Sequence, residues 1–152
     1  MNDILPQIKE RFNDVITAWD DSHERKVYVD ISGNGIFPVA DYTFNVLGCR
    51  FITISASDMP QGIEMLYHFS HDLSGTVISF RLLIADKAKP SIESISPLFI
   101  GSRWIEREVH ELMGVNFTGN SEQAKHLLLP DDWPGGVFPL RKDFIVKQEN
   151  HD

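Results

Sequence analysis

The spacing of apolar residues changes along the first 90 positions, and these changes predict both helices and strands. Near the N-terminus, apolar residues recur at steps of three and four, which predicts an amphipathic helix over residues 3–18. These residues are Ile4, Ile8, Phe12, Val15 and Trp19. A second helix is expected over residues 38–47, where Gly48 follows as a glycine suited to end it.

Alternation of apolar and polar residues predicts the strands. The alternating segments are residues 26–31, 50–57, 62–72 and 75–86. The polar turn at 72–75 joins the last two segments at a spacing typical of an antiparallel hairpin. We therefore expect an α+β fold with a mostly antiparallel sheet of about four strands and two helices in the N-terminal half.

The pattern changes again after Pro90. Residues 91–100 suggest a short helix, and Ser102 is a candidate cap for a second helix that runs to Met113 and ends at Gly114. This pair would form a helical hairpin. Beyond it, repeated glycines and prolines predict an extended tail. The expected parts of this single domain are an α+β core at 1–90, a helical segment at 91–114 and an extended docking tail at 115–152.

Composition excludes several classes of function. The chain has 152 residues, a net charge of −8 and an estimated pI near 5.1, which argues against nucleic-acid binding. Its one cysteine, Cys49, excludes an internal disulfide and is interpreted as a buried structural thiol. No signal peptide and no apolar run of membrane-spanning length is found, so we expect a cytoplasmic chain that docks on a membrane complex.

The segment 102–113 concentrates the candidate chemistry. Its apolar stripe, which we expect to pack inward, contains Ile105, Val109, Leu112 and Met113. Its charged residues are Glu106, Arg107, Glu108, His110 and Glu111. One interpretation is a solvated face with weak i,i+4 pairs, Glu106 with His110 and Arg107 with Glu111. The other is an acid/base set for catalysis.

Recognised cofactor and metal motifs are missing. The histidine spacing of zinc proteases fails because Gly114 stands four residues after His110. His68 and His71 lie three apart on an expected strand, which places them on opposite faces. The glycine fingerprint for dinucleotides, the phosphate-binding loop and the nucleophile elbow are all absent. We therefore expect no cofactor-binding or metal-binding residue in this chain.

The C-terminal region carries aromatic and apolar residues without a regular period. Trp133, Phe138 and Phe144 occur among glycines and prolines that disfavour a packed element. One interpretation is that this region folds back over its own core. The other is that it lies on a second protein, where Trp and Arg are frequent anchor residues.

Three segments in the same order resemble a known family. They are "WIEREVHELMGVNF" at 104–117, "LLLPDDW" at 127–133 and "PLRKDF" at 139–144. Together they resemble the 30 kDa subunit family of respiratory-chain NADH dehydrogenase, or complex I, which includes a related subunit of energy-converting membrane-bound hydrogenases. The chain departs from the family pattern at Asn120-Ser121, where the family usually has His-Pro.

The resemblance implies a scaffold subunit of the peripheral arm, which has no catalytic residue and binds no cofactor itself. Iron–sulfur clusters, and a flavin or nickel–iron centre, would belong to partner subunits, including a large hydrogenase-like subunit. Two alternatives remain: the equivalent subunit of a membrane-bound hydrogenase or formate hydrogenlyase-type complex, and a stand-alone acid/base enzyme.

The resemblance also implies roles for individual residues. The implied structural and assembly residues are Glu106, Arg107, Glu108, Glu111 and Gly114. The implied partner-docking residues of the tail are Lys125, Leu128, Pro130, Trp133, Leu140, Arg141, Lys142 and Asp143.

Overall fold

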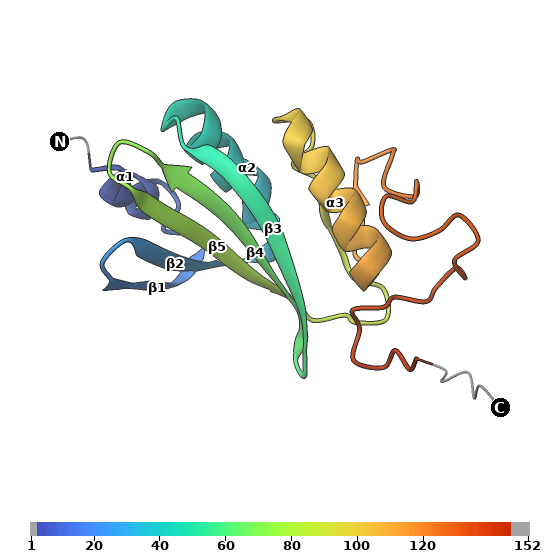
Figure 1. The fold of residues 1–152 in the computed structure, drawn as a ribbon. Helices are drawn as coiled ribbons and strands as arrows, with labels where there is room; N and C mark the ends of the chain where they lie inside the picture. The colour runs from blue at the N-terminus through green and yellow to red at the C-terminus, as the bar shows by residue number, and fades with distance from the viewer. Residues whose placement is uncertain (1–2, 147–152) are drawn as a thin grey trace.

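The computed structural model describes residues 3–146 and has the expected α+β architecture (Figure 1). In chain order its elements are α1 (Ile4–Arg11), β1 (Ile16–His23), β2 (Lys26–Ile31), the 3₁₀ turn η1 (Gly33–Gly35), α2 (Ile36–Asp41), the π-helical turn η2 (Tyr42–Val46), β3 (Arg50–Met59), β4 (Gly62–His71), β5 (Thr76–Ile84), β6 (Ser91–Glu93), α3 (Ile100–Met113) and β7 (Asn116–Thr118). Within 3–146, no helix is both long and apolar enough to cross a membrane.

Five strands form one sheet in the order β1-β2-β5-β4-β3. The predicted hairpin is the antiparallel pair β4 and β5, and β3 pairs antiparallel with β4 on the other side. β1 and β2 are antiparallel as well, whereas β2 runs parallel to β5 with Val29 opposite Phe80. The sheet is therefore mostly antiparallel, as predicted, with one strand more than the apolar pattern indicated.

The three helices pack against one face of this sheet (Figure 1). Alternate residues of β4 are fully buried on that face: Ile63, Met65, Tyr67 and Phe69. Ile8 of α1, Val39 of α2 and Met113 of α3 belong to the same core. Each large apolar side chain buried in this way contributes roughly 1.5–3 kcal/mol, so the core is the main source of stability. Cys49 is buried as predicted, and burial raises the pKa of its thiol to about 11.

The first helix is shorter than its apolar spacing predicted. α1 ends at Arg11, and Ile16–His23 forms the edge strand β1 instead of continuing the helix. β1 pairs with β2 from Ile16 opposite Ile31 to His23 opposite Lys26. The expected helix over 3–18 is therefore wrong beyond its first half. The reason is that β2 follows within a few residues as a pairing partner. Pairing with β2 stabilises these residues as a strand more than their spacing favours a helix.

The expected helical hairpin is not formed in the described chain. Ser91–Glu93 is β6, which runs parallel to β7 with Ile92 opposite Phe117. α3 begins at Ile100, so Ser102 lies inside its first turn, where its Oγ donates a hydrogen bond to Phe99 O at 2.8 Å. The other end of α3 is as predicted: Gly114 adopts a φ of 79° and closes the helix.

The region after β7 folds back over the chain at defined points. Leu140 N–H donates to Leu112 O of α3 at 3.0 Å, and Lys142 N–H donates to Asp58 Oδ2 of β3 at 2.9 Å. From residue 119 to 146 the chain is irregular, as expected for the tail. Residues 147–152 of the expected tail lie outside the described part of the structure.

Candidate functional site

Glu106 is the most deeply buried charged residue of α3. Its side chain is 0% exposed. Oε1 accepts a hydrogen bond from Ile95 N–H at 2.8 Å, and Oε2 accepts from Ser94 Oγ at 2.7 Å and Asn120 Nδ2 at 2.9 Å. One carboxylate thus joins the segment after β6, the middle of α3 and the turn after β7.

Burial decides the pKa of Glu106. Removal of water from around the carboxylate raises its pKa, and the hydrogen bonds from Ser94 and Asn120 only partly oppose that effect. Replacing a buried carboxylate that accepts from this set of donors lowers the stability of the fold, because loss of the acceptor leaves the donors unpaired. The geometry fits a structural joint and leaves the carboxylate without access for a substrate.

Arg107 extends from α3 in another direction and holds the loop at 125–129. Its Nε donates to Lys125 O at 3.1 Å and its Nη2 donates to His126 O at 3.0 Å. The guanidinium also lies over the ring of Trp104, 4.8 Å from the ring centroid. These contacts leave the Arg107 side chain almost fully buried.

Glu111 holds the same loop one turn further along α3. Its carboxylate accepts hydrogen bonds from Leu127 N–H at 2.9 Å and Leu128 N–H at 2.6 Å, and His126 Nδ1 lies 3.3 Å away. Burial acts to raise the pKa of Glu111. The backbone hydrogen bonds from Leu127 and Leu128 outweigh that effect, so the pKa lies below its usual value.

The expected i,i+4 pairs on a solvated face are therefore wrong. Glu106 and Arg107 bond to distant segments instead of to His110 and Glu111, and His110 Nδ1 is 2.8 Å from Val115 O. Within residues 3–146, the side chain of Glu108 makes no hydrogen bond or ion pair and is half-buried. Glu106 and Glu108 do not face a common cavity, since they lie about 200° apart around the helix.

Gly114 connects α3 with the tail through close packing. A Cβ atom at this position would lie 2.5 Å from Cε2 of Phe138, so the glycine provides room for the aromatic ring as well as the positive φ. The tail crosses the end of α3 at this point.

The predicted docking residues of the tail differ in their contacts and in their exposure. Trp133 and Arg141 make internal contacts: Trp133 Nε1 donates to Val137 O at 2.8 Å, and Arg141 donates to Lys87 O. Leu140 and Lys142 bond to the core through their backbone N–H groups. The exposed residues of the set are Lys125, Leu128, Pro130, Leu140, Lys142 and Asp143.

Sequence reasoning missed several residues that complete this arrangement. Ser94, a partner of Glu106, carries no signal of its own in the sequence, and Asn120, another partner, stood out only as a departure from the family pattern. Asp58 did carry a signal, because it occupies an inward position of β3 in the same alternation as Ile54. It pairs with the ammonium of Lys87, and the hydrogen bonds from Lys87 and Lys142 N–H lower its pKa.

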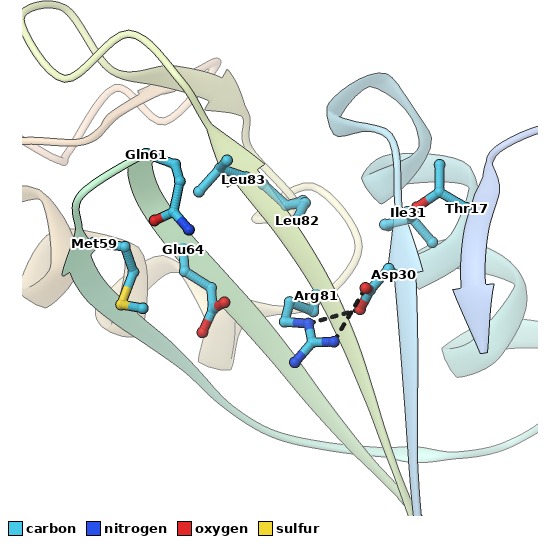
Figure 2. Close-up of a pocket in the computed structure, with 9 residues that line it drawn as sticks. All are labelled: Thr17, Asp30, Ile31, Met59, Gln61, Glu64, Arg81, Leu82 and Leu83. Carbon is cyan, nitrogen blue, oxygen red and sulfur yellow. Dashed lines mark hydrogen bonds and ion pairs between the residues drawn. The ribbon is translucent and has the colours of Figure 1, made fainter. Parts of the chain in front are cut away.

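A separate hollow lies across the sheet, away from these residues (Figure 2). It measures about 250 Å³ and is lined by Thr17, Asp30, Ile31, Met59, Gln61, Glu64, Arg81, Leu82 and Leu83. Arg81 Nε donates to Asp30 Oδ1 at 2.6 Å, and Nη2 donates to Oδ2 at 3.0 Å. Arg81 and Asp30 therefore neutralise each other, and Glu64 is the other carboxylate in the lining. Among the residues that the structure describes, no three His, Cys, Asp or Glu side chains are grouped to hold a metal ion.

Comparison with known proteins gives these contacts a context. Residues 10–150 match the family described as the respiratory-chain NADH dehydrogenase 30 kDa subunit. The chain is 31% identical over 138 residues to a subunit of the NADH-quinone oxidoreductase of Ruegeria pomeroyi, a match that covers 86% of this chain and 66% of the relative. It is 40% identical over 68 residues to a subunit of the NAD(P)H-quinone oxidoreductase of Prochlorococcus marinus, a match that covers 45% of this chain and 35% of the relative. The chain thus spans about one third to two thirds of the length of these two relatives.

Solved structures agree with the sequence matches. A chain in the membrane-bound sulfane sulfur reductase, an archaeal respiratory membrane complex, is 26% identical to this chain and superposes with a TM-score of 0.80. The superposition covers 95% of this chain and 85% of that one. The family match extends over α3, with Glu106, Arg107 and Glu111, and over most of the tail. The chain therefore belongs to the 30 kDa subunit family of respiratory-chain NADH dehydrogenase.

Proposed function

We propose that this chain is a non-catalytic scaffold subunit in the peripheral arm of a complex-I-like NADH:quinone oxidoreductase. It would brace a large hydrogenase-like subunit and iron–sulfur subunits at fixed distances. Electron transfer depends on such distances, although the electrons would pass through cofactors held by the partners. The chain itself would contact the membrane only through its complex, on the cytoplasmic side.

The observation that carries this proposal is the use of the motif's polar groups inside the fold. Glu106, Arg107 and Glu111 are all occupied by hydrogen bonds to backbone or side-chain groups of the same chain. An acid/base enzyme needs titratable groups that reach a substrate from a common pocket. The buried carboxylate of Glu106 does not meet that requirement, so the stand-alone enzyme is not supported.

A second complex type has a specific observation in its favour. The similarity to a chain of an archaeal respiratory membrane complex extends over almost the whole length of this chain. The equivalent subunit of an energy-converting membrane-bound hydrogenase, or of a formate hydrogenlyase-type complex, is therefore the alternative. The NADH:quinone oxidoreductase and this alternative assign the same bracing role to the chain. The two types of complex differ in their electron donor and acceptor.

Affinity purification of the tagged chain from gently solubilised membranes tests the proposal. Mass spectrometry of the co-purified proteins should identify a large hydrogenase-like subunit and at least one iron–sulfur subunit. The remaining partners would distinguish the NADH-oxidising complex from the hydrogenase type. Recovery of the chain alone, from the soluble fraction, would contradict the proposal.

A further inference from the structure

The residues of α3 divide between two sides of the helix. Glu106 and Met113 face the core, whereas Ile100, Trp104 and Glu108 follow one another at steps of four residues on the opposite side. Each such step rotates the position by only about 40°, so these three form one continuous outer row. The loop at 125–129 attaches to α3 through Arg107 and Glu111, beside this row, and it leaves Ile100 and Trp104 at least half exposed.

The outer row exposes large apolar side chains. Ile100 is 71% exposed and Trp104 is 50% exposed, and Leu128 on the adjacent loop is 62% exposed. A single exposed apolar residue needs no explanation, but a tryptophan between exposed aliphatic residues is typical of an interface anchor. Such side chains gain free energy when a partner covers them.

Trp104 is held in a defined position before any partner arrives. The Arg107 guanidinium lies over its ring, and the carbonyls of Lys125 and His126 fix that guanidinium in turn. Restricting an anchor in advance reduces the entropy that binding must remove. The same contacts direct the charge of Arg107 toward the loop carbonyls.

Glu108 contributes a charge without an internal partner in the described chain. The positions one helical turn away are Trp104, Ile105, Glu111 and Leu112, and none of them carries a positive charge. Within residues 3–146, no cation lies within ion-pair distance of its carboxylate. A carboxylate beside an exposed indole ring is complementary to an arginine or lysine, whose charge pairs with the acid while its stem lies along the ring.

We propose that the outer row, Ile100, Trp104 and Glu108, is the surface on which a partner subunit docks. The docking segment presents an arginine or lysine to Glu108 and aliphatic side chains to Trp104 and Ile100. This inference rests on the proposed function and identifies the surface through which the bracing acts. It divides the motif of α3 into residues that hold the fold and one charge that selects the partner.

Co-purification with variants of the tagged chain tests this surface. Trp104→Ala removes the anchor and Glu108→Arg reverses the charge, and each should lower recovery of the docked subunit by about tenfold or more. Two controls alter comparable groups elsewhere: Leu73→Ala at the exposed β4–β5 turn, and Glu64→Arg on the opposite face of the sheet. The controls should keep recovery within about twofold. Glu108→Arg also guards against misfolding, since it removes no side-chain hydrogen bond or ion pair of the described residues.

A photo-crosslinking phenylalanine analogue placed at Ile100, and for comparison at Leu73, gives a second readout. The reagent at Ile100 should join the chain to one partner subunit, and the reagent at Leu73 should not. Equal recovery of partners by the unaltered chain and both outer-row variants would overturn this inference alone. A crosslink from Ile100 to a second copy of this chain would also overturn it. If the unaltered chain recovers no partner, the proposed function fails and this inference fails with it.

Discussion

Phe138 lies so close to Gly114 that a Cβ atom at position 114 would be 2.5 Å from Cε2 of the ring. Gly114 also has a φ of 79°, a conformation that other L-residues rarely adopt. The same residue therefore ends α3 and provides the surface on which the tail packs. The end of α3 and the position of the tail therefore both depend on Gly114.

Gly114→Ala should lower the free energy of unfolding by about 1–3 kcal/mol, because the methyl group adds both backbone strain and a clash with Phe138. Gly101→Ala is a matched control: it lies in the same helix, and a Cβ there would meet nothing within 4 Å beyond its chain neighbours and the backbone of its own helix. The control should be neutral or stabilising by up to about 1 kcal/mol. Urea unfolding of the two variants measures the difference, and equal stabilities would contradict this account of Gly114.

Glu106→Gln should cost about 2–3 kcal/mol, because an amide NH₂ would face a donor where the carboxylate now accepts hydrogen bonds from Ser94, Ile95 and Asn120. Glu108→Gln, two residues along the same helix, should change stability by less than about 0.5 kcal/mol. Thermal unfolding of both variants tests the contrast. A larger effect at Glu108 than at Glu106 would contradict the assignment of the two sides of α3.

Stability should fall at acidic pH through Glu111. Its pKa is lowered in the folded state, so its stabilisation is complete above the unfolded pKa of about 4.3 and is lost as pH falls through the lower folded value. The stability difference between the unaltered chain and Glu111→Gln should therefore shrink below about pH 4.3. The contribution of Glu106 to stability changes in the opposite direction. Its pKa is raised in the folded state, so its contribution is complete below the unfolded pKa and falls as pH rises. Urea unfolding across a pH series measures both trends, and a difference at Glu111 that grows at acidic pH would exclude this role.

Arg107→Lys should loosen the loop at 125–129 while keeping the positive charge. Lysine cannot donate to both Lys125 O and His126 O in the forked geometry of the guanidinium. Hydrogen exchange at Leu127, Leu128 and Leu129 should accelerate, whereas exchange in β4 should stay unchanged. Unchanged protection at the three leucines would show that Glu111 alone holds the loop.

The sequence predicted the parts of the fold that depend on local pattern. β2 to β5 and the end of α3 at Gly114 were all found from alternation or from a glycine after an apolar stripe. β1 was missed because Val15 and Trp19 continue a helical spacing that only pairing with β2 overrides. β6 was missed because it has three residues and its partner β7 lies beyond a whole helix.

The candidate site was predictable in its residues but not in its geometry. Residue type placed Glu106 and Glu111 on a solvated flank, since isolated carboxylates are rarely buried. Their burial depends on donors from Ser94, Asn120 and the loop at 125–129, which tertiary folding brings to α3. The resemblance to the family indicated the same residues as structural, although it carried no information about which groups they contact.

The most direct test of the scaffold function separates assembly from chemistry in the native complex. The measurement is the amount of assembled complex, together with turnover per assembled complex, in cells that carry Arg107→Ala in this chain. We predict that the amount falls severalfold while turnover per assembled complex stays within about twofold, because the chain positions partners and performs no chemical step. Normal assembly combined with loss of turnover would contradict the scaffold function.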